Sequence, residues 1–368
     1  MFGQIEMSNM VNMNWLILKV IILVMSVSMF TLSPTSAAKE IDIKVPIKVQ
    51  QNIEIIAKQG VFTVSGWNKD FVSLNGEVKD DIRVEQSKST VVLELNTANP
   101  LAAGDLLEIK VPSDRKINIT SDHADFSLDK LTPKVTHETQ SSKIDSSISV
   151  SSIDGNVRVE NSSGDFSIST INGNITILDS SGIANIKSVS GHQNINSDLR
   201  NISSSNVSGQ SSYVLRTLEK LNLSNVNGNS LVKSSISQGA SVQMRSVKGH
   251  VELLVPDTTS ARFSLQSHQG GTVSNMIGGT VDPHQNTSGA QIFTLADASA
   301  NVTIDTLDGD ITVAPQNATT TEYVDEDYDW SSVDTSVLNF AFINPKYNSL
   351  DYKEIYIKQP EIHFDPSW

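Results

Sequence analysis

The chain has 368 residues, no cysteine and a formal net charge of −14. Nucleic acid is excluded as a partner, because phosphate contacts need clustered lysines and arginines, and a fold held by disulfides is excluded as well. Aromatic residues make up 6% of the chain, and its wealth of Ser, Asn, Val and Ile favours short strands and turns over helices.

The N-terminal segment resembles a secretory signal peptide. An apolar run covers residues 15–32, Lys19 lies near its start, and Ser36-Ala37-Ala38 provides small residues for cleavage. We expect residues 1–38 to be removed, which leaves an exported chain in the periplasm or at the cell surface with no transmembrane span. Met13 is an alternative start of the chain. The apolar run could also remain as an uncleaved membrane anchor, because about 18 apolar residues can just cross a bilayer.

Residues 39–150 are expected to form the N-terminal, strand-rich part of one domain that spans residues 39–315. Ile41, Ile43 and Val45 alternate with charged residues, and range 91–95 alternates in the same way. A period of two is typical of a strand with one buried face. Range 107–112 is a further strand that ends at Pro112, since proline cannot donate to a sheet ladder.

Residues 151–315 form the repeat part of that domain. Glycines recur at every ninth position from Gly155 to Gly191, and an Ile/Val-x-Gly triplet recurs every eighteen residues. Two alternating apolar residues follow most of these glycines. We therefore predict an all-β fold, a flattened parallel β-solenoid with two short strands per coil and glycine turns. An antiparallel meander with four-residue hairpin loops is the alternative.

The repeat becomes less regular after Gly191. The glycine turn persists, but its spacing grows to nineteen residues at Gly228 and to twenty-one at Gly249. The glycine-rich range 268–291 is predicted to be a long loop or an irregular excursion, and the repeat pattern returns around Gly309. Residues 316–368 are expected to be an acidic and aromatic linker followed by a tail that could cap the last coil.

Three features in this order resemble the bacterial "putative adhesin" family of exported β-strand-repeat envelope proteins, a domain of unknown function. They are the segment VSGWNKDFVSLNG at 64–76, the strand that ends at Pro112, and the repeated glycine units. The resemblance implies a β-helical, envelope-associated protein and brings no catalytic residue with it. The matching positions are structural, at turns and motifs: Gly66, Trp67, Gly76, Pro112, Gly155, Gly164, Gly173, Gly182, Gly191, Gly209, Gly228, Gly249 and Gly309.

No motif in the sequence carries recognisable chemistry. Each repeat has a single glycine followed by varied residues, which gives too few regular oxygen ligands for calcium. We predict no metal, no cofactor and no catalytic residue. The function expected is a non-enzymatic envelope protein that offers a binding or scaffold surface to an unknown protein or glycan. The alternatives are a carbohydrate-active β-helix enzyme, with carboxylates on consecutive coils, and an envelope sensor paired with a regulator.

Overall fold

The computed structural model describes residues 39–78, 82–95, 107–133, 148–282, 287 and 289–317. The expected signal peptide and the expected tail beyond residue 317 lie outside these residues. Within them, no helix is long and apolar enough to cross a bilayer. The strands are β1 Lys39–Pro46, β2 Asn52–Trp67, β3 Phe71–Val78, β4 Ile82–Gln86, β5 Thr90–Leu95, β6 Leu107–Pro112, β7 Ile117–Asp129, β8 Ile148–Asp154, β9 Val157–Glu160, β10 Ser163–Asn172, β11 Ile175–Ser190, β12 Gln193–Ser208, β13 Ser211–Asn227, β14 Ser230–Lys248, β15 Val251–Val255, β16 Ala261–Ser267, β17 Val273–Asn275, β18 Thr280–Val281, β19 Ala290–Leu295, β20 Ala300–Asp308 and β21 Ile311–Pro315.

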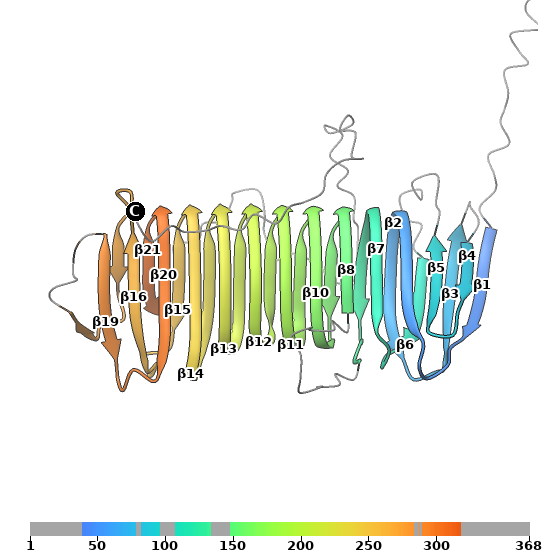
Figure 1. Ribbon diagram of the computed structural model, residues 1–368, viewed down its shortest axis with the longest axis horizontal. Helices are drawn as coiled ribbons and strands as arrows, with labels where there is room; N and C mark the ends of the chain where they lie inside the picture. The colour runs from blue at the N-terminus through green and yellow to red at the C-terminus, as the bar shows by residue number, and fades with distance from the viewer. Residues whose placement is uncertain are drawn as a thin grey trace, which may run out of the picture. The chain divides into compact units, whose positions relative to one another are not determined.

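The repeat part is a parallel solenoid, as predicted (Figure 1). Ile175 pairs with Val157 on one side and with Gln193 on the other, each eighteen residues away. Ser163 likewise pairs in parallel with Ser181. Each eighteen-residue coil therefore supplies two strand segments, and the antiparallel meander is ruled out for this part of the chain.

The coils enclose a core between two faces. Face A is formed by β9, the first halves of β11 to β14, β15 and β21, and face B by β8, β10, the second halves of β11 to β14, β20 and β16. Side chains alternate along each strand, so that Ile175 and Ile177 are fully buried while Thr176 lies on the outside. Burial of each such aliphatic side chain contributes about 1.5–3 kcal/mol, which makes the alternation the main source of stability.

The strand-rich part belongs to the same stack. β2 pairs with β7 along both of its halves, and β7 continues in parallel to β8 on one face and to β9 on the other. The hydrogen-bonded stack thus continues across residue 150.

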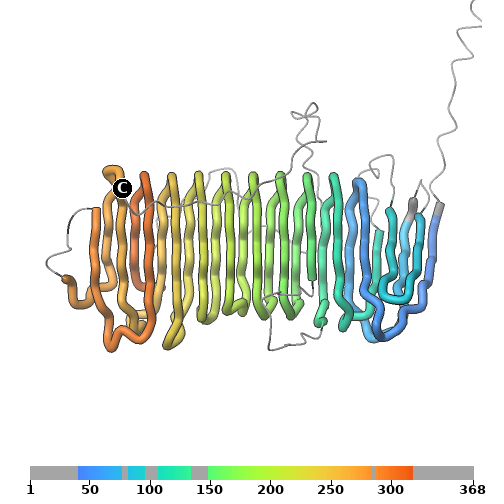
Figure 2. Tube along the Cα trace, in the orientation of Figure 1, coloured from blue at the N-terminus to red at the C-terminus, as the bar shows by residue number. Residues whose placement is uncertain are grey.

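Both ends of the stack are interwoven. At one end, β20 and β21 lie between the β14–β15 coil and the earlier strands β16 and β17 (Figure 2). At the other end, β2 lies between β7 and the later strands β5 and β6. Antiparallel strands complete each end: β18 and β19 at the end with β20 and β21, and β1, β3 and β4 at the end with β2. The last coil in the sequence is therefore held on both sides by coils that precede it.

Of the two interpretations of 268–291, the structure has the irregular excursion and not a single long loop. β17, β18 and the first residues of β19 lie within this range. The glycines there serve the turns between very short strands, for example Gly278 and Gly279, whose φ angles are +88° and +102°.

Candidate functional site

One edge of the solenoid, the glycine edge, is built from the glycines at which face B turns into face A of the next coil. Each glycine lies against the carbonyl oxygen of the glycine one coil away. A Cβ on Gly173 would lie 2.0 Å from the oxygen of Gly155, and one on Gly191 would lie 2.1 Å from that of Gly173. The column continues through Gly209, Gly228, Gly249 and Gly309, each with the same close approach. Any side chain at these positions would force the coils apart.

A buried polar column satisfies the carbonyl groups of this edge from inside. At four of these glycines the residue three positions earlier donates to the glycine's carbonyl oxygen, for example Thr170 Oγ1 to Gly173 at 3.2 Å and Asn225 Nδ2 to Gly228 at 2.9 Å. The same bond joins Asn206 to Gly209 and Thr306 to Gly309. A buried carbonyl without a donor costs about 1–3 kcal/mol, so these polar side chains have a structural role.

A second column follows the glycines on the outside of the same edge. After four of the glycines the next side chain accepts the backbone N–H of its counterpart one coil on. Asn156 Oδ1 accepts from Asn174, and Asn174 Oδ1 accepts from His192, at 2.9 and 2.8 Å. His192 Nδ1 in turn accepts from Gln210, at 3.1 Å. The polar groups beside the glycines are thus engaged in holding coils together.

The motif residues near the N-terminus lie together where β2, β3 and β6 meet. Gly66 pairs with Val111 and Trp67 with Pro112 across β2 and β6. Trp67 Nε1 donates to the Phe71 carbonyl oxygen at 2.9 Å. Gly76 lies in β3 opposite β1, with a φ of +150°. These residues fix the first strands of the stack and form no hollow of their own.

The opposite edge, where face A turns into face B, is irregular; we call it the variable edge. Gly164 and Gly182 stack there, but the following coil has Leu199 opposite Gly182. Beyond that point the coils lengthen: Asn201 pairs with Lys220 and Lys220 with Ser241, offsets of nineteen and twenty-one residues. The register shifts all fall at this edge, between Ser197 and Asn201 and then between 214 and 220. Every added residue of these coils is accommodated here, while the glycine edge keeps its geometry.

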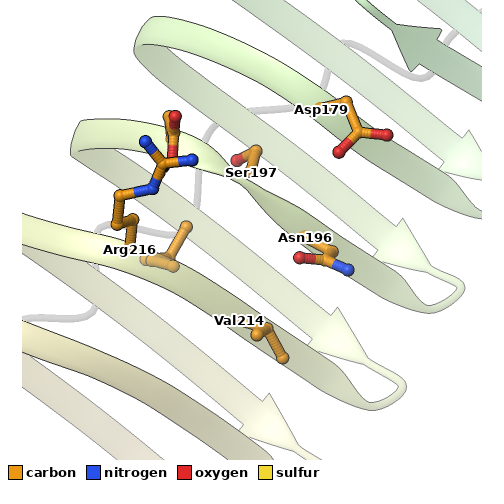
Figure 3. A pocket seen from close by; sticks show the side chains of 7 residues that line it. Asp179, Asn196, Ser197, Val214 and Arg216 are labelled. Atoms are coloured by element: carbon orange, nitrogen blue, oxygen red, sulfur yellow. Dashed lines mark ion pairs between the residues drawn. The ribbon is translucent and has the colours of Figure 1, made fainter.

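The variable edge contains a hollow with a volume of about 460 Å³, where the ladder between coils is interrupted. Three consecutive coils line it. β11 supplies Asp179, β12 supplies Asn196, Ser197 and Asp198, and β13 supplies Val214, Leu215 and Arg216 (Figure 3). Asp179 has a φ of +46°, and Asn161, one coil earlier, has nearly the same value, +47°. That backbone conformation is the one in which Asn and Asp are favoured.

Charge in the hollow is arranged as one ion pair and one further carboxylate. Arg216 Nε lies 3.0 Å from Asp198 Oδ1, and Asp179 lies across the hollow on the neighbouring coil. Val214 supplies an apolar surface and is 38% exposed, one of three large apolar side chains exposed among the described residues. A second pair, Arg200 with Glu219 at 3.2 Å, joins the same two coils, β12 and β13.

The clearly shifted titratable groups are spread along the stack. Burial raises the pKa of Asp125 and of Glu252. Burial also lowers the pKa of His250, while the charge of the Asp310 carboxylate acts in the opposite direction. Burial also raises the pKa of Tyr213, whose hydroxyl donates to Ser204 inside the core. Burial raises the pKa of Asp305 too, against the opposing effect of the nearby Arg245 and His268. The part of the chain that the structure describes has no cluster of His, Asp and Glu that could hold a metal ion.

Sequence reasoning did not identify Asp179, Asn196, Asp198, Val214 or Arg216. None of them belongs to a motif, and the spacing between them differs from coil to coil. The drift of the glycine spacing from eighteen to nineteen and twenty-one was the one signal that pointed to an expanding edge.

Comparison with known proteins identifies the domain. Residues 39–314, most of the chain, match the family model Toastrack DUF4097. Three crystal structures are similar over about three quarters of the chain. A "putative adhesin" from Bacteroides fragilis is 10% identical, covers 76% of this chain and 98% of its own, and has a TM-score of 0.38. A "putative cell adhesion protein" from Clostridium sporogenes (12% identity, 75% and 100% coverage, TM-score 0.19) and a "putative lipid binding protein" from Parabacteroides distasonis (7%, 75% and 96%, 0.37) are the others. The curated proteins contain no match.

Proposed function

Because the chain belongs to the Toastrack DUF4097 family, whose model spans residues 39–314, we propose that it is an exported, non-enzymatic binding protein of the cell envelope. In this proposal the solenoid is a rigid support and the variable edge is its binding surface. The ligand is a component of the envelope, either a protein or a glycan.

One observation carries the proposal: from β9 to β15, every register shift and every added residue of the coils falls on one edge. In repeat proteins, insertions within the repeats map to loops on one face, which is often the binding face. Here the same edge has the hollow at Asp179, an exposed Val214 and two charged pairs between β12 and β13. At the glycine edge, polar side chains such as Asn225 and Thr306 bond to glycine carbonyl groups within the stack.

The experiment has two parts. Cell fractionation with protease shaving of intact cells locates a C-terminally tagged chain, and we expect it in the envelope fractions. Purified chain is then incubated with isolated envelopes. We expect Asp179→Asn combined with Val214→Asp to weaken binding, while Asp308→Asn on the glycine edge leaves it unchanged. A cytoplasmic location, or equal binding by all variants, would reject the proposal.

A second candidate function is a carbohydrate-active enzyme. It is favoured by Asp179 and Asp198, two carboxylates on consecutive coils that line one hollow. Glycoside hydrolysis needs a pair of carboxyl groups, one of them able to donate a proton. Release of reducing sugar from envelope polysaccharide, abolished by Asp198→Asn, would replace the binding proposal with this one.

A further inference from the structure

The hollow on the variable edge presents hydrogen-bonding groups of three kinds on an apolar floor. Asp179 offers a carboxylate acceptor, Asn196 a carboxamide that both donates and accepts, and Arg216 a guanidinium donor. Val214 is partly exposed between them, and Leu215 beneath is 5% exposed. The volume lies in the usual range for small-ligand sites, about 300–1,000 Å³.

An anionic ligand does not fit this set. Two carboxylates, Asp179 and Asp198, line the hollow against a single guanidinium, and that guanidinium is already paired with Asp198 at 3.0 Å. A phosphate, sulfate or carboxylate would have to displace Asp198 from Arg216 and would still face Asp179. Like charges placed together in an interface are unfavourable.

A cationic ligand uses only part of the set. An ammonium group could bind Asp179, but it would lie near the Arg216 guanidinium, and the donor side of the Asn196 carboxamide would have no role. A neutral ligand rich in hydroxyl groups can contact every one of these side chains. Its hydroxyls donate to Asp179, exchange hydrogen bonds with Asn196 and accept from Arg216, while its C–H face packs on Val214.

The hollow extends along the axis over three consecutive coils, which carry Asp179, Asn196 and Arg216. Neighbouring strands are about 4.8 Å apart, and the Arg200–Glu219 pair joins the second and third of these coils. An extended polymer that lies along the axis would contact several coils at once. We propose that the hollow and the adjoining variable edge bind a neutral glycan chain. This inference rests on the proposed binding function and names its ligand class.

The test uses the full chain and an array of immobilised oligosaccharides. The probes are neutral and N-acetylated oligosaccharides, sialylated and sulfated ones, and a lysine-rich peptide as the cationic probe. We expect neutral probes to be retained. Asp179→Asn should weaken their binding about tenfold, because a hydrogen bond to a charged acceptor is roughly twice as strong as a neutral one. This variant should fold, since Asn161 occupies the equivalent position with the same backbone conformation.

Arg216→Gln should also weaken neutral-glycan binding, and Asp308→Asn, an exposed carboxylate on the glycine edge, is the matched control. Retention of anionic probes or of the peptide alone would overturn the inference, as would neutral-glycan binding that Asp179→Asn and Arg216→Gln leave unchanged. If no neutral glycan is retained while the edge variants still weaken envelope binding, the ligand class is wrong and the proposed function stands. If envelope binding is also unaffected, both fail.

Discussion

The two edges of the solenoid have the same task, reversing the chain between its two faces, and they do it in opposite ways. At the glycine edge, seven glycines from Gly155 to Gly309 stack so closely that a Cβ would lie 2.0–2.3 Å from a backbone oxygen. At the variable edge, glycines stack for only two coils, and then the turn grows by one residue and by two more.

The difference follows from which groups fill the turn. At the glycine edge the backbone itself occupies the space, and buried side chains such as Asn225 satisfy its carbonyl groups. Added atoms there would break contacts in two coils at once. At the variable edge side chains occupy the surface, so a coil can lengthen without disturbing its neighbours. One edge therefore maintains the stack, and the other is free to acquire a function.

The largest effect is expected in the core that both edges enclose. Ile175→Asp should lower the free energy of unfolding by about 4 kcal/mol, because it removes a fully buried side chain and buries a charge without a partner. Thr176→Asp, one residue on and facing outward, should cost less than about 0.5 kcal/mol. Urea unfolding of both variants is the measurement, and equal losses would show that the alternation is misassigned.

The next largest effect is expected from a glycine-to-alanine substitution, whose cost in stability differs between the two edges. Gly191→Ala should destabilise by about 3 kcal/mol or more, since the new methyl group meets the Gly173 oxygen and the φ of +141° is unfavourable for alanine. Gly239→Ala on the variable edge also has a positive φ, +77°, but nothing lies within 4 Å of its Cβ position. It should cost about 1 kcal/mol. Thermal melts of the pair test this, and a larger loss at Gly239 would contradict the comparison.

Removing one internal donor at the glycine edge should have a smaller effect. Asn225→Ala leaves the Gly228 carbonyl oxygen without its 2.9 Å bond and should cost about 1–3 kcal/mol. Arg216→Ala removes an exposed ion pair at the variable edge and should cost at most about 1 kcal/mol. If chemical denaturation ranks the two in the reverse order, the buried polar column is not what supports the glycine edge.

The smallest effect is a dependence on pH at the glycine edge. Burial lowers the pKa of His250 below its usual 6.5, so the unfolded chain takes up this proton first as the pH falls. His250 therefore contributes stability above pH 6.5 that is lost as the pH falls from there towards the lower, folded-state pKa. His250→Asn, which places the residue found at 156, 174 and 229, should reduce this loss. Urea midpoints at pH 7.5 and 5.5 give the comparison, and an unchanged pH dependence in the variant would assign it to other groups.

The sequence carried enough information for the fold class. Glycine at every ninth position, followed by alternating apolar residues, predicts stacked coils because both strand length and turn length are then constant. The order of coils at the ends could not be predicted. Range 302–313 has the same coil pattern wherever it stacks, and nothing local places it between β14–β15 and β16–β17.

The candidate site was less predictable for a physical reason. Gly155 and Gly164 look equivalent in the sequence, yet they lie on opposite edges, and only the first column continues along the stack. Asp179 and Arg216 are brought together by the stacking of coils of unequal length, so no fixed spacing links them. A chemical site made in this way leaves no motif.

The most direct test of the account is to lengthen one coil by a single residue at each edge in turn. A threonine inserted after Arg200 makes the turn there as long as the equivalent turn of the next coil, which runs from Leu215 to Lys220. A threonine inserted between Gly191 and His192 separates two residues whose N–H groups bond to Ser208 and to Asn174. We predict a loss of less than about 1 kcal/mol in the free energy of unfolding for the first and of more than about 3 kcal/mol for the second. Equal losses would contradict the claim that one edge maintains the stack while the other is free to vary.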